Sequence, residues 1–115
     1  MGALAAVTPT NNGIADPGAA VAASDTISAD ILGNRGALLE IVNGGGSSDT
    51  VAITDGGLTA AGSAATSPGS AVANGTSKIF YIEPSQVNPS TGLVTVTHTF
   101  TTSVTYKLYN LSGLV

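Results

Sequence analysis

Hydrophobic and polar side chains alternate along several short stretches of this chain, as they do in β-strands that bury one face. In the stretch 93–99, Val94, Val96 and His98 fall on one face and threonines fall on the other. The stretch 104–109 alternates in the same way. We therefore predict that these two strands form a hairpin with one buried and one solvated face.

A second pair of strands surrounds a glycine tract. Residues 37–43 are apolar on both faces apart from Glu40, as in an interior strand, and residues 50–54 alternate. The glycines at 44–46 begin the connection, which predicts a flexible turn between the arms of a second hairpin. Because Glu40 is the exception in its strand, we expect it at an edge or interface, paired with Arg35 or a lysine.

The remaining segments complete an all-β pattern. Further strands are predicted at 4–8, at 25–28, weakly near Leu58 and at 78–82, with one helical turn starting at Pro84. Residues 1–23 carry several turn signals and no sustained periodicity, which indicates an extended N-terminal arm. Residues 24–115 are predicted to form a single β domain, in which 55–77 are a long low-complexity loop. The predicted fold is a small β-sandwich or flattened barrel of about six or seven short antiparallel strands.

Composition limits the classes of partner. Three basic residues against seven acidic ones, with a formal net charge of −4, are too few to neutralise a phosphate backbone, so we expect no direct nucleic-acid binding. No apolar run approaches the ~20 residues of a membrane helix, and the amino terminus lacks the basic side chains of a secretory signal. We expect synthesis in the cytoplasm and no membrane partner. Small side chains bury little area, so we expect neighbouring subunits of a homo-oligomer, a dimer or trimer, to add stability.

No set of side chains has a recognisable catalytic or metal-binding spacing. The chain has no cysteine, and His98 is its single histidine, so thiolate sites and histidine-based triads are excluded. We predict that His98 is a half-exposed packing residue beside a turn, with a role as ligand or base as the alternative. Asp25 and Asp30 lack the alternating oxygen ligands of a calcium-binding loop. Glu40 has no second carboxylate with which it could form a catalytic pair. The glycines at 44–46 are not followed by the lysine of a phosphate-binding loop. We interpret the aspartates as turn caps and predict no cofactor, no metal and no enzyme activity.

The interaction surface is expected on the arm and along strand edges. Alternation places Phe80 and Tyr81 on opposite faces of their strand, so at least one is expected to be a surface anchor. The loop 55–77 is interpreted as a surface excursion, with a partner-binding loop as the alternative. The residues that we predict to contact a partner are Leu4, Val7, Pro9, Ile14 and Tyr81.

The order of several segments along the chain is informative. They are Thr8-Pro9-Thr10 and Gly13; Leu38-Leu39-Glu40-Ile41-Val42-Asn43-Gly44-Gly45-Gly46-Ser47 leading into Thr50-Val51-Ala52-Ile53; Ile79-Phe80-Tyr81-Ile82 with Pro84, Asn88 and Gly92; and Val94-Thr95-Val96-Thr97 followed by Ser103-Val104-Thr105. In this order, and over most of its length, the chain resembles the head decoration, or capsid cement, proteins of tailed bacteriophages.

The resemblance implies a non-enzymatic structural protein of the virion. Many copies would bind the outer surface of an icosahedral capsid and bridge neighbouring subunits of the major capsid protein, which is then the partner. Weak contacts repeated over a lattice would resist the pressure of the genome. The alternatives are a head–tail connector or tail structural protein, present in few copies per particle, and a carbohydrate-binding adhesive β domain, which a glycan array would reveal.

Overall fold

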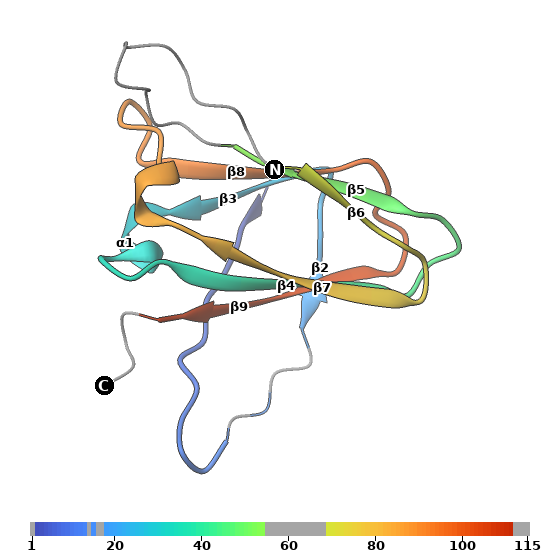
Figure 1. Cartoon of the computed structure of the whole chain (residues 1–115), viewed down its shortest axis with the longest axis horizontal. Helices are drawn as coiled ribbons and strands as arrows, with labels where there is room; N and C mark the ends of the chain where they lie inside the picture. The colour runs from blue at the N-terminus through green and yellow to red at the C-terminus, as the bar shows by residue number, and fades with distance from the viewer. Residues whose placement is uncertain (1, 14, 16–17, 55–68, 112–115) are drawn as a thin grey trace.

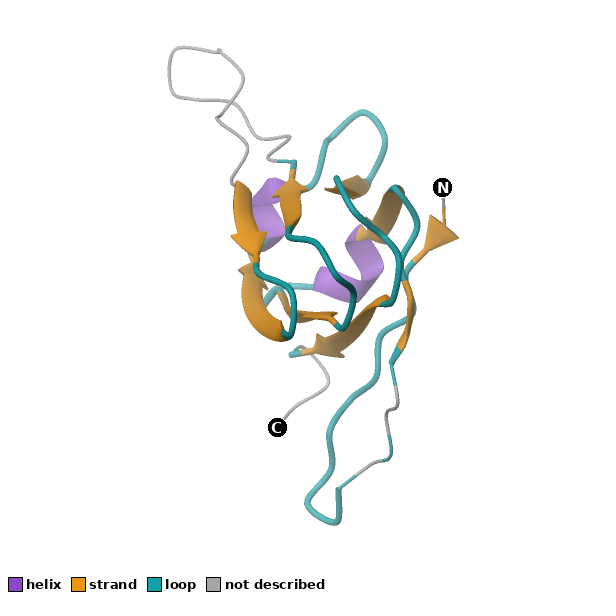
Figure 2. Ribbon diagram, turned by 90° about the vertical axis from the view of Figure 1, so that its right-hand side faces the viewer, coloured by secondary structure: helices purple, strands orange, loops and turns teal. Residues whose placement is uncertain are grey.

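The chain folds into two facing β-sheets, which confirms the predicted all-β sandwich (Figure 1). The computed structural model describes residues 2–13, 15, 18–54 and 69–111. Its strands are β1 (Gly2–Ala3), β2 (Ala19–Ala20), β3 (Ser24–Ser28), β4 (Ala37–Asn43), β5 (Asp49–Ile53), β6 (Gly69–Val72), β7 (Thr76–Ile82), β8 (Leu93–His98) and β9 (Val104–Asn110). A four-residue helix α1 (Ala29–Leu32) and a 3-10 turn η1 (Pro84–Gln86) lie at one end of the sandwich (Figures 1 and 2). The helical turn expected at Pro84 is confirmed as η1, whereas α1 has no counterpart in the sequence prediction.

The strand order identifies the topology of the sandwich. One sheet has the order β1-β3-β8-β5-β6 and the other the order β2-β9-β4-β7. From β2 to β9 the pairing is nested: β2 with β9, β3 with β8, β4 with β7 and β5 with β6. This nesting is that of a two-stranded ribbon folded across two sheets, the jelly-roll topology. The parallel pairing of β1 with β3 departs from the predicted antiparallel arrangement.

Alternation along the strands produces the core between the two layers. β4, β8 and β9 each bury every second residue over most of their length. The buried faces predicted for 93–99 and 104–109 are confirmed, because Val94, Val96 and Leu108 are at most 1% exposed. Each fully buried aliphatic side chain of this size contributes about 1.5–3 kcal/mol. The long aliphatic residues that fill the centre are Ile27, Leu39, Ile41, Val51 and Ile82.

The two predicted hairpins are wrong, because the strands of each lie in different sheets. β4 and β5 belong to opposite sheets, and so do β8 and β9. Residues 44–48 and 99–103 are therefore corners that carry the chain from one layer to the other. Alternation specifies a strand and its buried face, but a short loop can connect strands within one sheet or across two. The corners touch each other, since the Gly44 amide donates to the Ser103 carbonyl oxygen at 3.0 Å.

The glycine tract is held in place, which corrects the prediction of a flexible turn. Asn43 is buried, and its Nδ2 donates to the carbonyl oxygens of Ser47 at 2.7 Å and of Val72 at 3.0 Å. Its Oδ1 accepts the Gly45 amide at 3.0 Å. A Cβ atom on Gly45 would overlap the ring of Phe100. The sequence needs glycine here because the second corner packs directly on the first.

Both ends of the expected arm, residues 1–23, are part of the sandwich. β1 pairs with β3 and β2 pairs with β9. Leu4 and Val21 lie in the core, with 6% and 8% of their surface exposed, and Val7 forms a bridge beside β9. Between these anchors, residues 8–13 lead away from the body of the domain (Figure 1).

β6 lies within the segment 55–77 that was expected to be a loop. Its Val72 is fully buried, so the end of that segment supplies a core residue as well as an edge strand. The low content of large apolar residues hides this strand from a periodicity analysis. The weak strand predicted near Leu58, like all of 55–68, lies outside the described residues.

Candidate functional site

His98 and Asp49 form a buried pair in the first sheet. Asp49 begins β5, His98 ends the neighbouring β8, and the Nδ1 atom of His98 lies 2.6 Å from the Oδ2 atom of Asp49. The two side chains are 1% and 0% exposed, so the prediction of a half-exposed histidine is wrong. The reason is that His98 continues the inward row of Val94 and Val96 to the last residue of the strand.

The other oxygen of Asp49 caps the corner that follows β8. Oδ1 accepts the backbone amides of Thr99 at 3.0 Å and of Phe100 at 3.3 Å. The turn-capping role predicted for the aspartates is thereby confirmed for Asp49. Both oxygens of the carboxylate have partners within the protein, which makes the pair a structural clamp between β5, β8 and the 99–103 corner.

The candidate metal ligands in the described part of the chain do not form a cluster. Residues 2–13, 15, 18–54 and 69–111 contain no group of three or more His, Cys, Asp or Glu side chains able to hold a metal ion. In the same ranges every buried side-chain nitrogen or oxygen atom has a hydrogen-bond partner.

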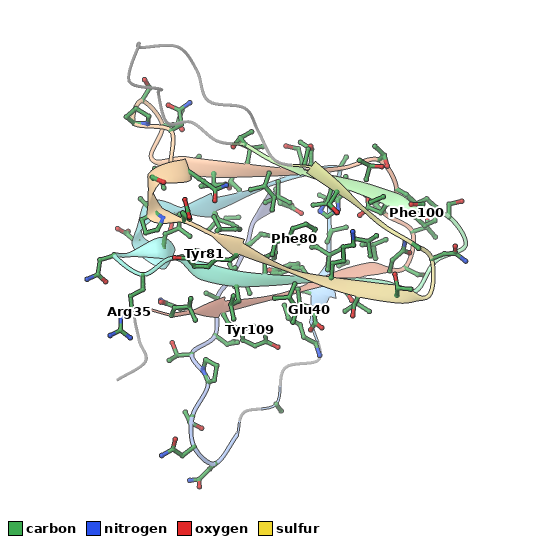
Figure 3. The ribbon with its side chains drawn as sticks, in the orientation of Figure 1. Arg35, Glu40, Phe80, Tyr81, Phe100 and Tyr109 are labelled. Carbon is green, nitrogen blue, oxygen red and sulfur yellow. The ribbon has the colours of Figure 1, made fainter. Side chains whose placement is uncertain are left out.

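Among the described residues, the large apolar side chains that are most exposed lie on β7. Ile79 is 63% exposed and Tyr81 is 52% exposed, whereas Phe80 packs against the core. The opposite facing of Phe80 and Tyr81 is as predicted, with Tyr81 as the surface residue (Figure 3). The Tyr81 hydroxyl donates to the Arg35 carbonyl oxygen at 2.8 Å, which fixes the ring over the end of the strand. We call this feature, residues 76–82, the β7 edge.

A groove runs beside the β7 edge, where the two sheets part. Its volume is about 350 Å³. Polar groups lie at its rim, with the Lys78 ammonium donating to the Ser70 hydroxyl at 2.6 Å. The residues that line it are Ile53, Ser70, Lys78, Ile79, Phe80, Tyr81 and Gln86.

Glu40, the charged residue in the otherwise apolar strand β4, lies on the outward face of the second sheet. Glu40 lies on β4, which is an interior strand between β9 and β7, so the expectation of an edge position is wrong. It faces outward, directly opposite Lys107 on one side and Ile79 on the other. A carboxylate is tolerated on an interior strand because this face of the sheet is solvated.

A second surface feature consists of residues 8–13, 15 and 18, the described part of the segment 8–18, which we call the arm loop. Its tip is a turn in which the Gly13 amide donates to the Thr10 carbonyl oxygen at 2.9 Å. At its base a hollow of about 140 Å³ lies between Val7, Gly18 and β9. The arm loop is thus flanked by two attachments to β9, the bridge at Val7 and the pairing of β2.

The predicted contact residues fall into two separate places. Val7 and Pro9 are half-buried at the base of the arm loop, on the β9 side of the second sheet. Tyr81 lies at the opposite edge of that sheet, with β9 and β4 between them. Leu4 is a core residue, and Ile14 lies outside the described residues. The sequence analysis missed Ile79, although its place two residues before Tyr81 puts both on one face.

Comparisons with known proteins add no identification. No family model, no curated protein and no solved structure matches the chain. No helix in the described part of the chain is long and apolar enough to cross a bilayer.

Proposed function

We propose that this protein is a non-enzymatic head decoration protein of a tailed bacteriophage, which binds the outside of the capsid and bridges subunits of the major capsid protein. The resemblance of its segments to that family names the role. Among the structural features, the arm loop is the one that supports the proposal.

The arm loop has the properties of a segment that lies over a partner. All its described residues are at least partly exposed, and the turn at Thr10 and Gly13 shapes its tip. Its two ends are tied to the same strand, β9, so a force on the loop is transmitted directly to the sheet. Such a loop reaches beyond the sandwich without requiring the domain to unfold (Figure 2).

The fold fits a structural role. Jelly rolls serve as viral capsid domains and as lectins, so the topology alone does not distinguish these two classes of protein. The surface features are needed to choose between them. Binding through a loop and sheet edges gives modest contacts per copy. Repetition of these contacts across a capsid lattice would raise the cost of separating its subunits, because anything that binds only the assembled shell stabilises it.

The proposal is tested by mixing the purified protein with undecorated capsids and sedimenting the particles. The protein should pellet with capsids at micromolar concentration and raise the temperature at which they release their genome. Protein that stays in the supernatant would contradict the proposal. Copy number separates decoration, with many copies per particle, from the alternative of a connector or tail protein, with a single ring.

One observation favours a second candidate function. Leu38 of β4 pairs with Tyr81 on β7 and with Tyr109 on β9. Both tyrosines face outward, so the two aromatic rings lie on the same face of the second sheet, on either side of Leu38. Paired tyrosines on an exposed face could stack on sugar rings, as in a carbohydrate-binding adhesive domain. Binding to a glycan array that is lost in Tyr81→Ala would support this alternative, and an array without hits would dispose of it.

A further inference from the structure

The β7 edge is the longest outermost strand of the two sheets. It has seven residues, whereas the other outermost strands of the two sheets, β1, β2 and β6, have two to four. β7 pairs with β4 on one side and with no described strand on the other. A long, apolar edge of this kind is a template for pairing with another chain, and proteins blunt such edges unless they use them. Two of its exposed side chains, Ile79 and Tyr81, are large and apolar. The one charge on the strand, Lys78, is also exposed, but its ammonium group is bonded to the Ser70 hydroxyl of β6 in the same chain.

The backbone groups available at this edge can be assigned from the neighbouring ladder. The Gly44 amide donates to the Ser103 carbonyl oxygen and the Leu111 amide to the Gly36 carbonyl oxygen, both in the register of β4 with β9. Hydrogen-bonded pairs alternate along an antiparallel ladder, so the even-numbered residues of β4 bond to β9 and the odd-numbered ones to β7.

The register of β4 with β7 then places the free groups of the edge. Leu39 lies opposite Phe80 and Ile41 opposite Lys78, so the even-numbered residues of β7 direct their amides and carbonyls toward β4. The odd-numbered residues Ser77, Ile79 and Tyr81 direct theirs away from the sheet. These same residues carry the outward-facing side chains, including the two exposed apolar ones.

We propose that the β7 edge pairs with the β7 edge of a second copy of this chain, antiparallel, about a two-fold axis at Ile79. In this register Ile79 lies opposite itself and Ser77 lies opposite Tyr81, so all the outward backbone groups of these three residues are bonded. The second sheets of the two copies join into one continuous sheet. Ile79, the most exposed large apolar side chain among the described residues, becomes covered.

Charge and the length of β7 select this register over its neighbours. Centring the pair on Lys78 would put two ammonium groups directly opposite each other, which is destabilising. Centring it on Phe80 would place Ser77 opposite Glu83, beyond the end of β7. With the axis at Ile79, Lys78 of each copy lies opposite Phe80 of the other, so no like charges meet. The grooves beside the two strands then meet at the axis.

Cysteine cross-linking tests both the surface and the register, because the chain has no cysteine of its own. Residues in a hydrogen-bonded antiparallel pair have Cα atoms about 5.5 Å apart, within the range that a disulfide spans. Mild oxidation of Ile79→Cys should give a covalent dimer. Ser77→Cys and Tyr81→Cys should each stay monomeric alone, while the variant with both changes should cross-link.

The control for random collision is Asn74→Cys, in the exposed turn before β7. Cross-linking of Ile79→Cys no faster than that of Asn74→Cys would overturn the proposal. So would preferential self-linking through Lys78→Cys or Phe80→Cys, which would indicate another register.

Light scattering provides a second readout that needs no oxidation. At about 0.1 mM, where an interface with a micromolar dissociation constant is filled, the unmodified protein should have the mass of a dimer and Ile79→Pro that of a monomer. Proline is tolerated there because the Ile79 amide points away from β4. A monomeric unmodified protein, or a dimer that survives Ile79→Pro, would overturn the proposal. Only purified protein is used, so the result is independent of capsid binding.

Discussion

The Oδ2 atom of Asp49 lies 2.6 Å from Nδ1 of His98, and neither side chain is exposed to solvent. A carboxylate only accepts hydrogen bonds, so the His98 ring donates through Nδ1. Because Oδ1 also accepts the amides of Thr99 and Phe100, one side chain joins two strands of the first sheet to a corner between the sheets. The only histidine of the chain thus has a structural role in the sandwich.

Removing the carboxylate of this clamp should destabilise the protein strongly. Asp49→Ala leaves the His98 ring and two corner amides without their acceptor, and breaking a buried pair in this way costs about 3–5 kcal/mol. Urea unfolding at neutral pH measures the loss. Asp30→Ala is the control, because Asp30 is exposed on α1 and its replacement should cost about 0.5 kcal/mol or less. Equal midpoints for the two variants would contradict the clamp.

Neighbouring glycines of the 44–48 corner should respond differently to the same substitution. Gly45→Ala drives a methyl group into the Phe100 ring and the Thr102 carbonyl, so we expect a loss of about 1–3 kcal/mol. Gly46→Ala meets no atom within 4 Å and should be neutral or slightly stabilising, because it restricts the unfolded chain. Thermal unfolding of both variants checks this. A flexible glycine turn would tolerate both changes alike.

The amino-terminal segment should contribute to stability and not behave as a loose appendage. Leu4→Ala removes a core side chain that is 6% exposed, which costs about 2–5 kcal/mol. Thr8→Ala, at an exposed position four residues later, should change little. Unfolding by urea, with limited proteolysis of the amino terminus, compares the two. Unchanged stability in Leu4→Ala would show that the segment is detached from the sandwich in solution.

Contact with a capsid should depend on the tip of the arm loop. Asn12 and Asn74 are both exposed in turns and each precedes a glycine of positive φ, at +79° and +77°. Asn12→Arg should weaken co-sedimentation with capsids at least about tenfold, equivalent to about 1.4 kcal/mol, by adding bulk and charge at the contact. Asn74→Arg, the matched change at another turn, should bind as the unmodified protein does. Weakened binding of Asn74→Arg together with unchanged binding of Asn12→Arg would indicate that the β6–β7 turn contacts the capsid instead.

The strands and their buried faces could be predicted from the sequence, because period-two alternation is a local signal. Ala37–Asn43 was delimited to the residue, and the inward row of Val94, Val96 and His98 was correct. The sheet that each strand joins could not be predicted, since nothing in residues 44–48 separates a hairpin turn from a corner. The pairing of β4 with β7 depends on contacts between segments some forty residues apart in the chain.

The surface was harder to predict than the core. Tyr81 was identified because it neighbours Phe80 in an alternating strand, and the same argument applies to Ile79. No periodic pattern surrounds Leu4, so the sequence predicts a surface position, whereas the side chain lies in the core beside β3. A two-residue strand such as β1 is too short to show a period, so its burial is decided by the tertiary structure alone.

The most direct test of the proposed function is a cryo-electron microscopy map of capsids with and without the purified protein. The account predicts added density on the outer surface, repeated at the junctions between major capsid subunits, with the arm loop against the shell and the sandwich outside it. Density confined to the neck or tail of the particle, or no added density at saturating protein, would contradict it.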